Sequence, residues 1–248
     1  MKKTKIIIPA LGLLLLSTAA SVSGTVAWFS MNKTVTATGM SVTAKSDSSF
    51  LLIGNSDQTL EQIQSANATS VSALAATATG ELYPAAHTND VTNYATANNP
   101  ENWYYEYSVD PKKSFESGVT QHTALSTEGV VFSDYVLINT FRITVAAGGR
   151  SVNGLKVEAI TINVPSGGVD AVNVIVASST AMQEFKANDS DATDNTVLAA
   201  SVTNSDYVEV STFIYWNGAH TGVFTNNASK LLETAVTVSF TYNSVATA

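Results

Sequence analysis

The chain contains no cysteine, and this absence excludes both a disulfide framework and any metal site built on thiolates. Charged residues are few, at 13% of 248, and acidic ones dominate, because 20 Asp and Glu against 12 Lys and Arg give a formal net charge of −8. Such a chain repels nucleic acid, so a nucleic-acid partner is not expected. Thr, Ser, Val, Ala and Asn are abundant instead, and this composition favours strands and turns over helices.

Residues 1–27 have the three parts of a secretory signal peptide. Lysines at the start precede an apolar run over residues 6–16, and small residues then lead to Ala27. We expect cleavage between Ala27 and Trp28, with Ala20 as a second candidate site. The alternative is an uncleaved anchor, for which this run is short against the ~20 residues of a membrane span. Loss of three leader lysines takes Lys and Arg from 12 to 9 against 20 acidic residues, so the secreted protein carries a formal net charge of −11. After cleavage we expect no stable membrane anchor.

Residues 28–44 show the period-two alternation of a β-strand. Polar Ser, Asn and Thr separate the apolar positions, only Lys33 is out of place, and the apolar phase changes after Gly39. Because no hairpin partner precedes it, this strand must join the sheet of its own subunit or that of another, and we predict a donor strand for a neighbouring subunit. The apolar side of the predicted donor strand consists of Phe29, Met31, Val35, Ala37, Gly39, Met40 and Val42.

A leader that runs directly into G-T-x-A-x-F, here Gly24, Thr25, Ala27 and Phe29, and then into an alternating strand resembles the TasA/camelysin family. A weaker similarity lies in residues 236–242. Members are secreted proteins of Gram-positive bacteria with a SipW-type signal peptide. The resemblance implies a SipW-type signal peptidase as partner, a jelly-roll-like β-sandwich and self-assembly into fibres of the extracellular matrix or biofilm. In such fibres the N-terminal strand of one subunit completes the sheet of the next. Camelysins are also classed as metallopeptidases.

The rest of the chain predicts a single domain over residues 28–248, an all-β antiparallel β-sandwich with a few short helices. That this sandwich is jelly-roll-like is what the resemblance implies. Residues 49–53 form a short strand, and residues 58–67 have helical spacing. Residues 54–133 are predicted as a large irregular insertion. Its aromatic cluster is either a satellite core that pins the insertion or a surface for carbohydrate or subunit contact. The cluster consists of Trp103, Tyr104, Tyr105 and Tyr107.

After residue 134, strand patterns recur at the intervals of a sandwich. Apolar residues alternate over 137–145, 172–176, 208–216 and 236–242. In the strand over 155–164 the phase shifts near Ala159 and Ile160, which indicates a bulge. Residues 180–186 and 228–233 are predicted as short helical turns.

No catalytic, cofactor or metal site emerges from the sequence. His87, His122 and His220 lie in separate polar loops without H-E-x-x-H spacing, and G-x-S-x-G is absent. The acidic run with Asp189, Asp191 and Asp194 lacks the glycine and distal glutamate of an EF-hand, so a solvated loop is favoured over a calcium site. We therefore predict a secreted, non-enzymatic fibre subunit. The alternatives are a monomeric carbohydrate-binding module and, with less support, a secreted metallopeptidase.

Overall fold

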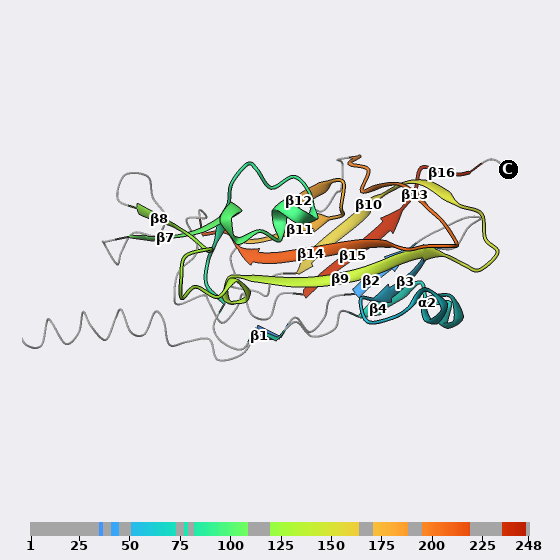
Figure 1. The fold of residues 1–248 in the computed structure, drawn as a ribbon, viewed down its shortest axis with the longest axis horizontal. Coiled ribbons are helices and arrows are strands. Elements are labelled where there is room, and N and C mark those ends of the chain that lie inside the picture. Colours follow the sequence, from blue (N-terminus) through green and yellow to red (C-terminus); the bar gives the residue numbers. More distant parts are fainter. Residues whose placement is uncertain are drawn as a thin grey trace, which may run out of the picture.

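The structure, a computed structural model, describes residues 35–36, 41–44, 51–72, 77–78, 82–108, 120–163, 171–187, 195–218 and 235–246. Most of these residues belong to strands, and two sheets face one another across a shared apolar core (Figure 1). The strands are mainly antiparallel. The predicted all-β sandwich is therefore confirmed.

Sheet I has the strand order β13-β10-β15-β2-β4, and β16 pairs with the start of β10. The pair β10 and β15 is antiparallel, with a register shift between Val157 and Ala159, close to the predicted bulge. The pair β15 and β2 is parallel, with Val42 opposite Val238. The strands span Ser41–Ala44 (β2), Ser70–Ser72 (β4), Val152–Asn163 (β10), Ala199–Val202 (β13), Ala235–Thr241 (β15) and Ser244–Val245 (β16).

Sheet II has the order β12-β11-β14-β9-β3, with every neighbouring pair antiparallel. Its strands are Leu51–Asn55 (β3), Val136–Val145 (β9), Val172–Ala177 (β11), Met182–Lys186 (β12) and Val208–Trp216 (β14). The helical turn predicted over residues 180–186 is wrong, because residues 182–186 form β12. A local preference for a single helical turn is weak, whereas pairing with β11 satisfies five successive positions, from Lys186 opposite Asn173 to Met182 opposite Ala177.

The main core lies between the two sheets and follows the alternation seen in the sequence. Along β14, Val210, Ile214 and Trp216 point into it, and along β15 so do Val236, Val238 and Phe240. The same holds for the alternating residues of β9 and β11. Each large apolar side chain fully buried here stabilises the fold by about 1.5–3 kcal/mol relative to an exposed position. The strand predictions for the second half of the chain are thus confirmed by burial.

The range 54–133, predicted as irregular, contains several regular elements. They are α2 (Leu60–Ala66), β4, β5 (Thr77–Ala78), β6 (Ala86–His87), α3 (Tyr94–Ala97), the 3-10 turn η1 (Pro100–Asn102), β7 (Trp103–Ser108) and β8 (Thr120–Ala124). A second 3-10 turn, η2 (Phe132–Asp134), follows. Strand β4 belongs to sheet I, and β6, β7 and β8 form a small antiparallel sheet of their own.

A second core lies on the outer face of sheet II. We call the described residues between 82 and 135 the cap. Cap residues Val91, Trp103 and Leu125 pack there with Ile175 and Phe213 of the sheet, and the green cap segment lies over β11, β12 and β14 in Figure 1. All six residues of β11 are therefore buried, because both faces of this strand are covered.

Helix α2 illustrates how local sequence sets an element. Thr59 caps its start in a capping box with Gln62, and Asn67 ends it in the left-handed conformation at φ 47°. Ile63 is its buried residue. The helical spacing predicted over residues 58–67 is confirmed.

Replacing Gly54 by alanine is expected to lower the melting temperature by several degrees. A Cβ on Gly54 would lie 2.4 Å from Cγ1 of Ile63 and 2.8 Å from Oε1 of Gln58, so α2 would have to move away from β3. Overpacking of this kind costs about 1–3 kcal/mol, and each kcal/mol shifts the melting point by about 2–4 °C in a domain of this size. Thermal unfolding of Gly54→Ala, beside Ser65→Ala on the exposed side of α2 as control, measures this. Identical melting of Gly54→Ala and the wild type would contradict the packing.

Candidate functional site

The predicted donor strand is described at two places, and both pair within the same chain. In β1 (Val35–Thr36), Val35 lies opposite Ala78 of β5. Val42 lies in β2, between β15 and β4. The cleavage site Ala27–Trp28 and the donor residues Phe29, Met31, Ala37, Gly39 and Met40 lie outside the described residues.

Trp103, from the predicted aromatic cluster, is fully buried at 0% exposure. Its indole N–H donates to the carbonyl of Ala97 at 2.8 Å. Its ring contacts those of Phe132 and Tyr215 at centroid distances of 5.8 and 4.9 Å. The interpretation as a satellite core that pins the insertion is therefore confirmed for Trp103, and no sugar can stack on this ring.

The tyrosines near Trp103 form a group at the edge of the cap. Tyr105 stacks on Tyr135 at 5.5 Å, and Tyr83 meets the same ring at 5.4 Å. All three are partly exposed. Burial, together with Tyr105, Tyr83 and Asp134, raises the pKa of Tyr135 to about 12, so it stays protonated at neutral pH. Tyr104 is also partly exposed, and the side chain of Tyr107 lies outside the described residues.

A buried polar cluster joins the cap to sheet II. His87 of β6 places Nε2 3.4 Å from Oε1 of Glu184 on β12, and the two side chains are 15% and 25% exposed. The same carboxylate oxygen accepts a hydrogen bond from the Tyr215 hydroxyl on β14 and one from Nδ2 of Asn173 on β11 at 2.7 Å. Nδ2 of Asn173 also donates to the Tyr215 hydroxyl at 3.1 Å. Side chains of β11 and β14 thus hold the Glu184 carboxylate of β12 beside the cap histidine, His87.

The electrostatics of this cluster favour a charged pair. Burial alone would raise the pKa of Glu184, but hydrogen bonds from His87, Tyr215 and Asn173 and the charge of His87 lower it to about 2. Burial alone would lower the pKa of His87, but Glu184 and the Thr88 carbonyl raise it above 6.5. Burial and the neighbouring carboxylate of Glu184 raise the pKa of Tyr215, which therefore remains a hydroxyl donor.

Sequence reasoning missed this cluster because its members are spread over residues 87–215 and lie in four different strands. His87 was expected to lie in a polar loop, but it belongs to β6 and is largely buried. The only local signal was polar Asn173 in an otherwise apolar strand, V-N-V-I-V-A.

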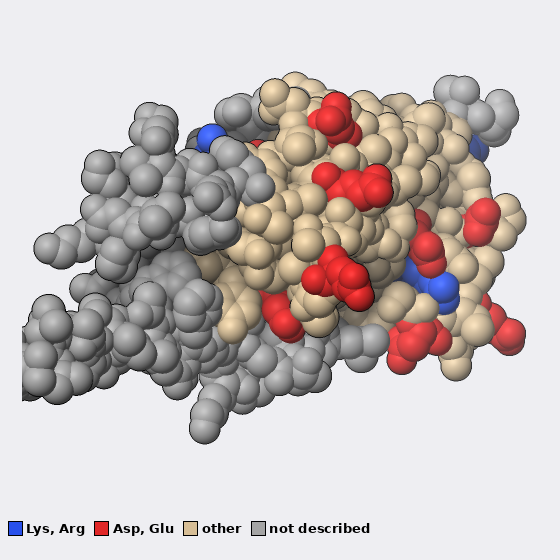
Figure 2. All heavy atoms as spheres, turned by 60° about the vertical axis from the view of Figure 1, so that its left-hand side comes forward, with Lys and Arg blue, Asp and Glu red and all other residues tan. Residues whose placement is uncertain are grey.

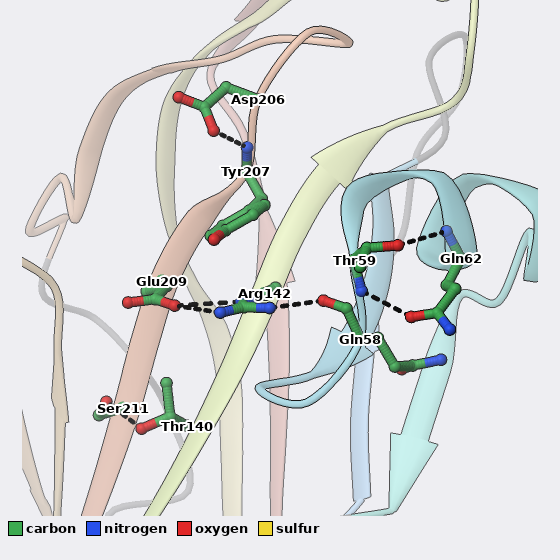
Figure 3. Close-up of polar contacts among 9 residues, drawn as sticks. All are labelled: Gln58, Thr59, Gln62, Thr140, Arg142, Asp206, Tyr207, Glu209 and Ser211. Carbon is green, nitrogen blue, oxygen red and sulfur yellow. Dashed lines mark hydrogen bonds and ion pairs between the residues drawn. The ribbon is translucent and has the colours of Figure 1, made fainter.

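A second polar arrangement surrounds Arg142 on β9, as Figure 3 shows. Its Nε and Nη2 each lie 3.0 Å from Oε1 of Glu209 on β14, and Nη1 donates to the carbonyl of Gln58 at 2.6 Å. The guanidinium also lies 4.4 Å from the ring centre of Tyr207. Arg142 thereby ties the segment before α2 to sheet II. These contacts engage all three nitrogens of the guanidinium in holding the fold together.

The described residues contain no group of three or more His, Asp or Glu that could hold a metal ion. Asp189, Asp191, Asp194 and His220 lie outside them, as does the side chain of His122. In the same part of the chain, no helix has the length and apolar character needed to cross a membrane. Acidic side chains are spread over the face drawn in Figure 2, where basic ones are few.

Removing divalent cations is expected to leave the melting temperature unchanged. The sequence offers no ligand set with workable spacing, so no folding energy should come from a bound metal. Thermal unfolding with and without EDTA measures this. A fall of several degrees on chelation, reversed by added calcium, would contradict the prediction and point first to Asp189, Asp191 and Asp194.

No protein-family model matches this chain, and no curated protein or solved structure shows significant similarity to it. The function must therefore be argued from the residues and the fold.

Proposed function

We propose that this protein is a secreted structural subunit of an extracellular fibre or matrix, and that it polymerises by donating its N-terminal strand to the next subunit. The observation that carries the proposal is the alternation of residues 28–44, which changes phase after Gly39. Of its described residues, β2 lies in sheet I of its own chain and β1 pairs with β5. Strand addition of this kind takes its affinity from backbone hydrogen bonds and its register from alternate side chains.

The position of β2 supports the proposal that the segment before it extends to a neighbouring subunit. Strand β2 begins at Ser41 opposite Thr237, near the start of β15, so the chain enters sheet I from that end. The residues from Trp28 to Met40 would reach about 40 Å if extended, at about 3.3 Å per residue. In the neighbour, Phe29 and Met31 would fill apolar pockets, each contributing about 1.5–3 kcal/mol when fully buried. Lys33 would keep its ammonium group in water at the rim.

In sheet I, the hydrogen-bond ladder along one side of β10 is incomplete among the described residues. Strand β13 pairs with β10 only between Val152 and Leu155. On that side, the described residues supply no partner strand for residues 157–163 of β10. An unpaired strand edge is a template for another chain, so this stretch is a candidate acceptor for a donated strand.

A carbohydrate-binding module is the second candidate function. The partly exposed group of Tyr83, Tyr105 and Tyr135 favours it, because aromatic rings offer apolar faces to sugars. The burial of Trp103 removes the largest ring of the predicted stacking surface. Nothing in the described residues favours the metallopeptidase.

Electron microscopy of purified protein that begins at Trp28 tests the proposal. We expect regular filaments, with a subunit that elutes as a monomer only at low concentration. A monomer at every concentration that binds immobilised glycans would replace the fibre function by the second candidate. Proteolysis that EDTA abolishes would establish the peptidase instead.

A further inference from the structure

His87 makes an ionic contact between the cap and sheet II with Glu184, beside backbone hydrogen bonds such as that from the Ala85 N–H to the Trp216 carbonyl at 2.9 Å. Both of its ring nitrogens face acceptors. Nδ1 lies 2.8 Å from the carbonyl oxygen of Thr88, and Nε2 lies 3.4 Å from Oε1 of Glu184. A neutral imidazole carries a single N–H, so one nitrogen lone pair would then point at an acceptor oxygen. Only the imidazolium form donates on both sides.

We propose that His87 is a pH-sensitive clasp: as imidazolium it holds the cap on the outer face of sheet II through Glu184, and its deprotonation loosens the cap. The inference is independent of fibre formation, because it concerns the attachment of one part of the subunit to another. It does not require any residue of the donor segment.

The groups around His87 leave Glu184 as its charged partner. Tyr215 from β14 and Trp103 from β7 present uncharged rings to the imidazole, with centroids at 5.9 and 5.3 Å. On β12, Lys186 lies two positions beyond Glu184 and therefore on the same face, and it is exposed. Asp90, beyond the turn, is hydrogen-bonded to the Thr88 hydroxyl. On β7, Tyr104 raises the pKa of Tyr215.

The direction of the pH dependence follows from the two pKa values. The pKa of His87 is raised in the folded protein, so its contribution is complete below 6.5 and is lost as the pH rises through the folded value. The pKa of Glu184 is lowered from 4.5 to about 2, so its contribution is complete above 4.5 and is lost as the pH falls toward 2. The cap is therefore held most firmly between about pH 4.5 and 6.5.

The contact between His87 and Glu184 lies beside the second core. The rings of Trp103 and Tyr215, which flank His87, also contact each other at 4.9 Å. Loss of the charged pair leaves Glu184 with its two partners inside the sheet, Tyr215 and Asn173. It removes the one ion pair that the described residues show between cap and sheet, so that backbone hydrogen bonds and apolar packing hold the cap alone. Opening then occurs at the boundary between cap and sheet, whereas the main core is unaffected.

The first test is an NMR titration of the histidine ring signals in the full secreted chain, with His87→Gln used to assign His87. We expect the His87 ring to titrate above 6.5 and to fall to 6.5 or below in Glu184→Gln, which keeps hydrogen-bonding atoms but removes the charge. A His87 ring that titrates at or below 6.5 in the wild type, or that is unmoved by Glu184→Gln, would overturn the clasp.

The second test follows the indole N–H of Trp103, whose exchange with solvent requires the cap to open. After correction for base catalysis, we expect its protection to fall between pH 6 and pH 9 by about tenfold for each unit by which the pKa of His87 exceeds 6.5. The backbone amide of Ile214 in sheet II is the internal control and should show no such loss. Protection of Trp103 that does not change with pH in the wild type, or that changes equally in His87→Gln, would refute the proposal.

Discussion

Deletion of residues 28–38 is expected to abolish filaments while leaving a folded subunit. The deletion removes Phe29, Met31 and Val35, which in the proposed fibre fill pockets of the neighbour. It also removes β1 with its pairing to β5, and it leaves β2, sheet I and sheet II intact. The truncated protein should be less stable, because its acceptor edge stays open. Negative-stain microscopy and circular dichroism of the truncated protein measure the two effects separately.

Adding a peptide of residues 28–38 to the truncated protein should then restore stability in proportion to occupancy. At a peptide concentration a hundred times its dissociation constant, the gain is about 2.7 kcal/mol. The matched control is a peptide of the same composition in which the alternating apolar and polar positions are shifted by one residue. Such a shift turns every side chain to the opposite face of the strand. Normal polymerisation of the truncated protein would exclude the donor-strand mechanism.

The competing arrangement folds the same segment into its own subunit, as the pairing of Val35 with Ala78 illustrates. Phe29→Ala and Ser30→Ala in the full chain separate the two. If the strand is donated, Phe29→Ala should raise the critical concentration for filaments while leaving the melting temperature of the monomer unchanged. Ser30→Ala, on the polar side, should change neither. A lowered monomer melting temperature in Phe29→Ala would favour the internal arrangement.

Trp103→Ala is expected to destabilise the protein by about 3–5 kcal/mol, the range measured for large buried aromatic residues. The side chain is fully buried in the second core, packs on Phe132 and Tyr215, and donates its indole N–H to Ala97. Its removal leaves a large cavity and a carbonyl without its partner. Denaturant unfolding, followed by circular dichroism, measures the loss of free energy.

Two further variants separate packing from the hydrogen bond. Trp103→Phe keeps most of the apolar contact but leaves the Ala97 carbonyl unsatisfied, so it should cost about 1–3 kcal/mol. Val131→Ala, at a cap position that is 53% exposed, should stay within about 0.5 kcal/mol of the wild type. Equal stability of Trp103→Ala and Val131→Ala would show that the second core does not support the cap.

The sequence alone determined the elements whose pattern is local. Alternation over residues 208–216 and 236–242 is enough to predict β14 and β15, because a strand with one face on a core repeats every second residue. Helical spacing predicted α2, whose capping box lies within four residues, from Thr59 to Gln62. The phase shift in β10 similarly placed a bulge within a few residues of its position.

Tertiary structure decided which elements meet. Residues 182–186 became β12 because β11 offered a partner strand, and the parallel pairing of β2 with β15 joins segments almost 200 residues apart in the chain. Trp103 is a core residue rather than a binding surface only because the cap folds over sheet II. The contact of His87 with Glu184 depends on the same event, because the charge of a histidine is set by the groups that surround it in space, and here those groups come from strands far from it in the chain.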